Sequence, residues 1–197
     1  MLFRSDAEAA FKYAVKEGNK YVVGGIYVFR TIWYYLIGDY ENALEMARKA
    51  VEQRKLSDFA LTFYEGLAAV AIASTLKSQQ RRKYRNLGQV MAKRLRLWTR
   101  RCADNFLNKQ LLLDAEIAGL NGKAISAISL FQKSIDKAAK EGFIHEEGVA
   151  YERLGHYQLH LGRKSDAMKS FVSARTAFDN WGAIRLVRRM NQMLASM

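Results

Sequence analysis

Small and apolar residues recur along the chain at steps of three and four, the spacing that places side chains on one face of an α-helix. The clearest examples follow three glycines: Gly38 precedes Tyr40, Ala43, Ala47 and Ala50; Gly122 precedes Ala124, Ala127, Phe131 and Ser134; and Gly162 precedes Ala167, Phe171 and Ala174. No stretch keeps the period of two that is typical of strands. The sequence therefore predicts an all-α fold, with alanines where helices approach each other closely.

Turn signals separate these helices at regular distances. They are Gly38-Asp39, Lys77-Ser78-Gln79, Asn121-Gly122 and Leu161-Gly162-Arg163. Gly122 and Gly162 are 40 residues apart, and Gly38 lies 84 residues before Gly122, which is about two such periods. A period of this length is typical of stacked helix pairs. The predicted helices are 6–17, 20–37, 40–54, 58–77, 82–101, 105–120, 123–140, 145–161, 165–179 and 182–195, with Asp39 and Ser165 as N-caps.

The composition is that of a globular protein. Of the 197 residues, 50% are hydrophobic and 26% are charged, and no proline interrupts a helix. Cys102 is the single cysteine, which excludes an internal disulfide and favours a reducing, cytoplasmic location. The two most apolar stretches, 21–37 and 59–76, are interrupted by Arg30 and Glu65, so we expect buried helices there rather than membrane spans.

The net charge of +13 favours an acidic partner, and many of the cations lie between residues 77 and 109. They are Arg81, Arg82, Lys83, Arg85, Lys93, Arg94, Arg96, Arg100 and Arg101, and Asp104 is the one acid among them. The block fits a solvated face, a docking site for an acidic protein, or a site for nucleic acid or anionic membrane. A buried stripe is predicted on the same helix, made of Leu87, Val90, Met91, Leu95 and Trp98. The predicted partner-binding residues here are Arg81, Arg82, Arg85 and Arg94.

Aromatic residues crowd a second helix pair. They are Tyr27, Phe29, Trp33, Tyr34, Tyr35 and Tyr40. We expect Trp33 and Tyr34 to fill the core. The cluster still exceeds what one buried stripe can hold, so some members are expected to line a groove for a partner helix or peptide. Tyr27, Arg30 and Tyr34 are therefore added as predicted partner-binding residues.

Motifs of catalysis are missing from the sequence. It contains no phosphate-binding loop and no kinase catalytic loop. His145-Glu146 resembles the start of a zinc-protease motif, but Val149 stands where the second histidine is needed. Glu152, His156 and His160 share a helix face at metal-ligand spacing, yet no fourth ligand is evident, and packing is the favoured interpretation. Cys102 is interpreted as a small core residue, although Arg100 and Arg101 could activate its thiol.

The turn pattern resembles the tetratricopeptide repeat. The last pair carries the signature best, with Tyr151, Leu154, Gly155, Gly162, Ala167, Phe171 and Ala174 at the repeat's spacings. A second likeness covers about residues 59–190 and includes Leu97-Trp98, Cys102, Asn105-Phe106, Ala115-Glu116, Glu141-Gly142-Phe143 and Trp181-Gly182-Ala183. These elements resemble the helical-repeat segment of multi-domain signalling proteins that combine kinase-like, ATPase and histidine-kinase modules. The resemblance implies regulation by contact, with catalysis in other modules.

Together, these observations predict a single helical-repeat domain over 1–197. We expect a right-handed array of about four antiparallel helix pairs, near 20–54, 58–101, 105–140 and 145–179, with flanking helices 6–17 and 182–195. The expected function is a non-enzymatic scaffold in signal transduction that binds protein segments or neighbouring signalling domains, without cofactor or metal. The alternative is a basic helical protein that binds nucleic acid or anionic membrane.

Overall fold

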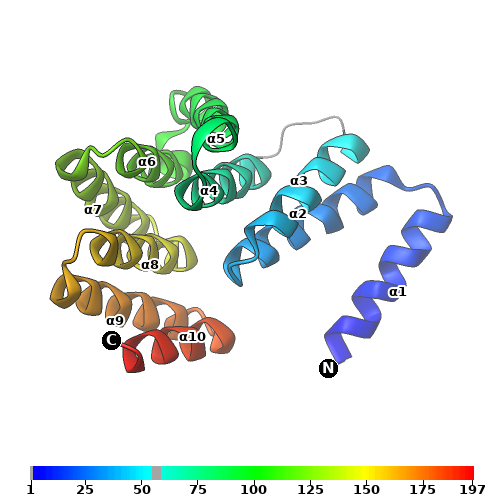
Figure 1. Cartoon of the computed structure of the whole chain (residues 1–197). Helices are drawn as coiled ribbons and strands as arrows, with labels where there is room; N and C mark the ends of the chain where they lie inside the picture. The colour runs from blue at the N-terminus through cyan, green and yellow to red at the C-terminus, as the bar shows by residue number, and fades with distance from the viewer. Residues whose placement is uncertain (1, 55–58) are drawn as a thin grey trace. The chain divides into compact units, whose positions relative to one another are not determined.

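The computed structural model describes residues 2–54 and 59–197, which form two compact units, Met1–Tyr84 (unit 1) and Arg85–Met197 (unit 2). All regular structure in the described residues is α-helical, so the predicted all-α fold is confirmed (Figure 1). Helix α5 (Ser78–Thr99) begins in unit 1 and ends in unit 2. A single domain over the whole chain stays a prediction.

Unit 1 is built around one helix pair. Helices α2 (Lys20–Leu36) and α3 (Tyr40–Arg54) pack along each other, α4 (Phe59–Thr75) packs against both, and α1 (Leu2–Lys16) packs against α2. The core contains Val28, Ala47, Ala50 and Leu61. Helix α4 is buried over most of its length, which explains its continuous apolar sequence.

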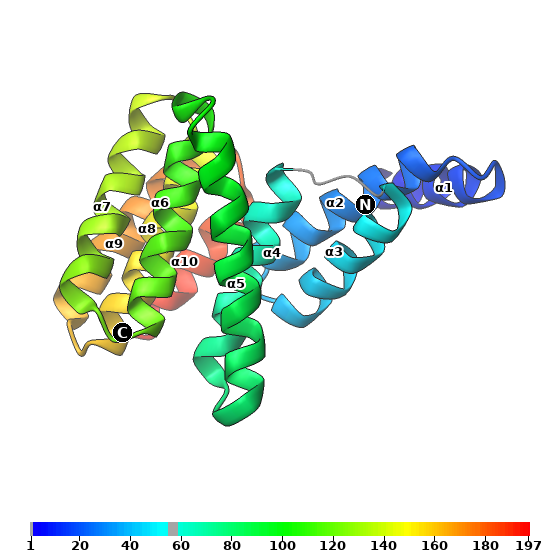
Figure 2. The same cartoon turned by 90° about the horizontal axis from the view of Figure 1, so that it is seen from above.

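Unit 2 is a regular row of helices. After the second half of α5 come α6 (Ala103–Leu120), α7 (Ala124–Lys140), α8 (Ile144–His160), α9 (Lys164–Asn180) and α10 (Ile184–Ala195). Each helix from α6 onward packs against the next, and α6 also contacts α8 (Figure 2). The predicted pairs 105–140 and 145–179 are thus α6–α7 and α8–α9. Fully buried phenylalanines fill the spaces between them: Phe131, Phe171 and Phe178.

Helices α6, α7, α8 and α9 are each followed by a glycine, and these glycines are spaced twenty residues apart. Gly122, Gly142, Gly162 and Gly182 all have positive φ, between 73° and 78°. At each glycine, the backbone N–H of the next residue donates a hydrogen bond to the carbonyl oxygen five residues before it, as from Lys123 N–H to Ala118 O at 2.9 Å. The predicted forty-residue period is therefore made of two equal steps, each with a three-residue turn. Helices α7, α8 and α9 accordingly have 17 residues each.

One of the two predicted N-caps is confirmed. Asp39 Oδ1 accepts from the backbone N–H of Asn42 at 3.2 Å at the start of α3. Ser165 is not a cap, because α9 begins one residue earlier at Lys164 and its N-cap position is Arg163, whose side chain makes no capping bond. No helix in the described part of the chain is long and apolar enough to cross a membrane.

Candidate protein-interaction site

Helix α5 is held in unit 2 by one apolar face. Met91, Ala92 and Leu95 are buried, and the ring of Trp98 lies 6.0 Å from the ring of Phe106 on α6. The predicted stripe includes Val90, but Val90 does not belong to this buried face, because its side chain is 47% exposed. The reason is its position, because Val90 precedes Met91 by about 100° of helical rotation and so points away from the core.

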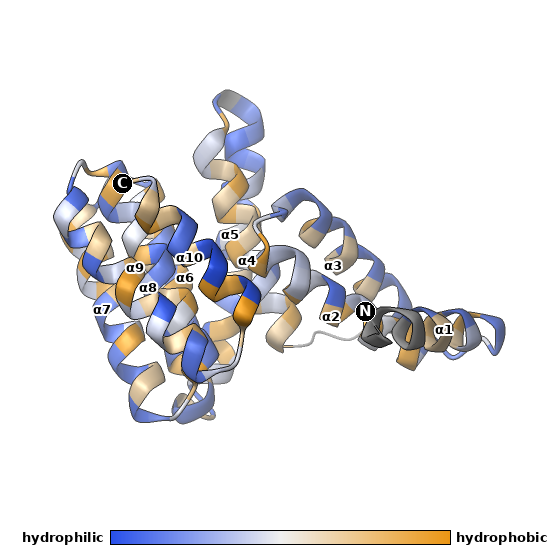
Figure 3. Ribbon diagram, turned by 90° about the horizontal axis from the view of Figure 1, so that it is seen from below, coloured by the Kyte–Doolittle hydropathy of each residue, from blue (hydrophilic) through white to orange (hydrophobic). Residues whose placement is uncertain are grey.

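The remaining surface of α5 is basic, and Figure 3 colours much of this helix as hydrophilic. Of the predicted partner-binding residues on α5, Arg82 and Arg94 are exposed, whereas Arg81 and Arg85 are half-buried. Arg81 and Arg82 belong to unit 1, and Arg85 and Arg94 belong to unit 2. They share a helix, and their role in binding stays a prediction.

Few acids neutralise the part of this surface that lies in unit 2. Arg96 pairs with Asp114 of α6, with 2.5 Å between nitrogen and oxygen. Asp104 pairs instead with Lys137 of α7 at 2.8 Å, and this lysine holds the pKa of Asp104 below its usual value. We define the basic face as the exposed cations Lys93, Arg94, Arg100 and Arg101. None of the four forms an ion pair within the described residues.

The predicted aromatic cluster on α2 is divided between packing and surface. Tyr27 is half-buried, with its ring 5.5 Å from that of Phe11 on α1. The Arg30 guanidinium lies 4.4 Å from the Phe11 ring centre and pairs with Glu8 at 2.8 Å. These two residues therefore attach α1 to α2, and binding of a partner by them stays a prediction.

The expected core positions on α2 are only partly correct. Tyr34 is half-buried, whereas Trp33 is 46% exposed and Tyr35 is the buried aromatic, at 4%. Trp33 points outward because it lies two residues before Tyr35, which places the two side chains on opposite sides of the helix.

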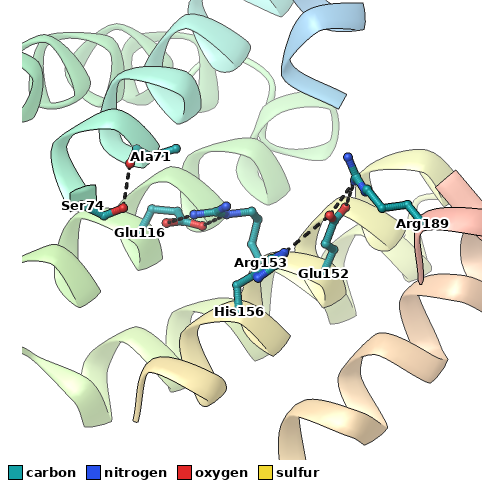
Figure 4. Close-up of polar contacts among 7 residues, drawn as sticks. All are labelled: Ala71, Ser74, Glu116, Glu152, Arg153, His156 and Arg189. Atoms are coloured by element: carbon teal, nitrogen blue, oxygen red, sulfur yellow. Dashed lines mark hydrogen bonds and ion pairs between the residues drawn. The ribbon is translucent and has the colours of Figure 1, made fainter. Parts of the chain in front are cut away.

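Sequence reasoning missed a set of ion pairs that join alternate helices of unit 2. Lys109 of α6 pairs with Glu146 of α8, Glu116 of α6 with Arg153 of α8, and Glu152 of α8 with Arg189 of α10. Each pair spans 37 residues of sequence. Figure 4 shows the last two, on either side of α8. Opposite charges 37 apart, close to the forty-residue period, were the signal that could have revealed them.

The pair formed by Lys109 and Glu146 is the most deeply buried of the three. Their residues are 4% and 5% exposed, and the Nζ–Oε2 distance is 2.8 Å. Asn108 also donates to Glu146, while Lys109 donates to Asn105 O at 2.9 Å and lies 4.1 Å from the Phe143 ring centre. Burial alone would raise the pKa of Glu146, but hydrogen bonding from His145 and the charge of Lys109 outweigh it, and the pKa lies below its usual value.

The suspected metal-ligand line on α8 has other partners. Glu152 receives two bonds from Arg189, at 2.5 and 2.6 Å, and its Oε1 lies 3.7 Å from His156 Nε2. The rings of His156 and His160 contact Phe171 and Tyr157, with centres 5.2 and 6.3 Å apart. Throughout the described chain, no three His, Cys, Asp or Glu side chains gather as a metal site would require. Glu152 and His156 thus contact α10 and α9, whereas the contact of His160 lies within α8.

Acid should destabilise unit 2 through its buried carboxylates. The pKa values of Glu146 and Glu152 are both lowered, because their basic partners outweigh burial. A lowered pKa means that the contribution to stability is complete above the unfolded value of 4.5 and is lost as pH falls through the folded value. We expect a steady urea midpoint from about pH 7 to 5 and a steep fall below.

The control for this acid effect is a double variant with Glu146→Gln and Glu152→Gln, whose midpoint should depend less on pH between about 5 and 3. A wild-type midpoint that stays level through this range would contradict the assignment.

The fold and the surface define the class of protein. Stacked helix pairs closed by glycine turns, with aromatic residues buried against small ones, form a helical repeat of the tetratricopeptide (TPR) type. TPR repeats are typically protein–protein interaction modules without catalysis of their own. A model of the family described as "CHK1-like, TPR repeats" matches residues 24–155, about two thirds of the chain. The chain belongs to this family, which confirms the predicted TPR-like resemblance. A comparison with curated proteins found no match.

Proposed function

We propose that this chain is a non-enzymatic scaffold of signal transduction that binds acidic segments of other proteins or of neighbouring signalling domains. The observation that carries the proposal is the basic face, whose four cations are exposed and form no ion pair within the described residues. Membership of a CHK1-like TPR family supports protein partners. Arg81, Arg82 and Arg85, the other predicted partner-binding cations of α5, and a cytoplasmic location are part of the proposal.

Packing of the aromatic residues favours a protein partner over nucleic acid. Binding of single strands relies on aromatic faces that are free to stack on bases. Trp98 is half-buried against Phe106, and Tyr84 is half-buried, with Lys83 Nζ 5.6 Å from its ring centre. Because these rings are partly covered, they offer less face for stacking on bases, whereas the exposed cations provide charge for an acidic surface.

The test is direct binding of three probes to the full chain at fixed salt: a glutamate-rich peptide, a DNA duplex and phosphatidylserine vesicles. We expect the peptide to bind, and Lys93→Glu with Arg94→Glu to weaken its affinity about tenfold or more, because each reversal replaces attraction by repulsion. The matched control reverses Lys123 and Lys133, which are also exposed.

Two results would overturn the proposal. One is a lack of peptide binding even at low salt, where exposed charges act most strongly. The other is tighter binding of the duplex or of the vesicles, lost on the same reversal, which would establish the alternative function.

A further inference from the structure

Two exposed apolar side chains lie among the cations of the basic face, although a purely electrostatic site does not require them. Val90 is 47% exposed and Leu97 is 53% exposed, although both lie on a helix whose opposite side is packed into unit 2. They are seven residues apart, which places them on the same side of α5, two turns from each other. The surface is therefore a short apolar strip within a field of positive charge.

Two cations of the basic face flank this strip at helical spacing, and the other two follow it in the turn after α5. Lys93 and Arg94 follow Val90 by three and four residues and precede Leu97 by four and three, so they lie on both sides of the strip. Arg100 and Arg101 follow Leu97 by the same three and four residues, in the turn after α5. Apolar positions flanked by charges at this spacing are typical of a helix that pairs with another helix.

From this arrangement we propose that the partner segment is an acidic amphipathic helix that lies along α5, with its apolar residues on Val90 and Leu97 and its carboxylates against the four cations. This inference rests on the proposed function and adds the conformation of the partner. The positive charge favours a partner segment that is acidic, and the apolar strip favours a segment that forms a helix with a matching apolar stripe.

Alternatives explain the strip less well. An interfacial membrane helix buries a broad apolar face and commonly includes large aromatic residues, whereas this strip consists of one valine and one leucine. Helix α5 is also already fixed by Met91, Leu95 and Trp98, so a docking helix finds an ordered surface and little entropy is lost by the scaffold.

The experiment compares two peptides of identical composition, rich in glutamate and leucine. In the first peptide the leucines follow helical spacing and form a stripe, and in the second they are distributed around the helix. Affinity for the full chain is measured by fluorescence anisotropy, and helix formation on binding by circular dichroism. We expect the striped peptide to bind about tenfold tighter and to gain helicity.

Variants separate the two levels of the proposal. Val90→Ala with Leu97→Ala should remove the tenfold difference in affinity between the two peptides. The affinity for the second peptide, whose leucines are distributed around the helix, should stay unchanged. Lys93→Glu with Arg94→Glu should weaken both peptides. The matched control is Ile125→Ala, which truncates an 89% exposed apolar side chain on α7. Thermal melting of each variant checks that the fold is retained.

Each outcome has a distinct meaning. Equal affinity for the two peptides would overturn the inferred helix while the acidic-partner function stands. Binding of neither peptide would overturn both. Stronger binding to phosphatidylserine vesicles, dependent on Val90 and Leu97, would replace the protein helix by a membrane surface.

Discussion

Replacing Lys109 by methionine should lower the free energy of unfolding of unit 2 by about 3–5 kcal/mol, because it leaves the buried carboxylate of Glu146 without its cation. Methionine fills most of the space of the lysine stem, so the loss reflects charge rather than a cavity. The measurement is urea unfolding at neutral pH, followed by tryptophan fluorescence, to which Trp98 and Trp181 of unit 2 contribute together with Trp33 of unit 1. The ring of Trp181 lies 5.2 Å from that of His145, next to Glu146, which makes it a local reporter.

The control is Lys137→Met, which removes a lysine that pairs with Asp104 and Glu141, two acids that are both more exposed to water than Glu146. Its effect should be smaller, since water can still reach both carboxylates once the lysine is removed. A double variant with Lys109→Met and Glu146→Leu should regain much of the lost stability, because no buried charge remains. If Lys109→Met unfolds no earlier than Lys137→Met, the buried pair does not have the assigned role.

Replacing Phe171 by alanine should cost about 3–5 kcal/mol of unfolding free energy. Phe171 is fully buried between α8 and α9, and its ring touches the backbone of Gly155 so closely that an added Cβ there would lie 2.7 Å from ring atom Cε1. The control is Val172→Ala, one residue further along α9 and 41% exposed, with an expected change of less than about 0.5 kcal/mol.

Gly155 gives this prediction a second, independent test. Gly155→Ala should destabilise by about 1–3 kcal/mol, since the methyl group and the ring compete for the same space. In a Phe171→Leu background the same change should cost less, and a double-mutant cycle measures the difference. Strict additivity of the two changes would show that the ring and the glycine do not constrain each other.

The helices could be predicted from the sequence because their signals are local. Steps of three and four among small residues, together with glycine at the turns, depend only on the helix itself. All ten predicted helices appear within a few residues of their predicted bounds in the described ranges. The sequence pattern does not mark Gly142 and Gly182 as turns of the same kind as Gly122, and the twenty-residue step is visible only in their positive φ angles.

The candidate site was only partly predictable, because exposure depends on neighbours distant in sequence. The basic character of α5 is visible in the sequence alone. The packing of α6 against its neighbours decides which cations its acids pair with. Asp104 pairs with Lys137, and Asp114 pairs with Arg96. The predicted stripe is wrong at Val90 because this side chain lies about 100° around the helix from the buried Met91 and is exposed.

The constant step between the glycine turns bears on how such a chain can change over evolutionary time. A duplication or deletion of forty residues within unit 2 would add or remove one whole helix pair and keep every remaining helix in phase with its neighbours. An insertion of a few residues inside a helix would instead rotate all contacts that follow it. A change in the number of helix pairs is therefore the change that this architecture tolerates best. Homologues should differ in length by multiples of about forty residues.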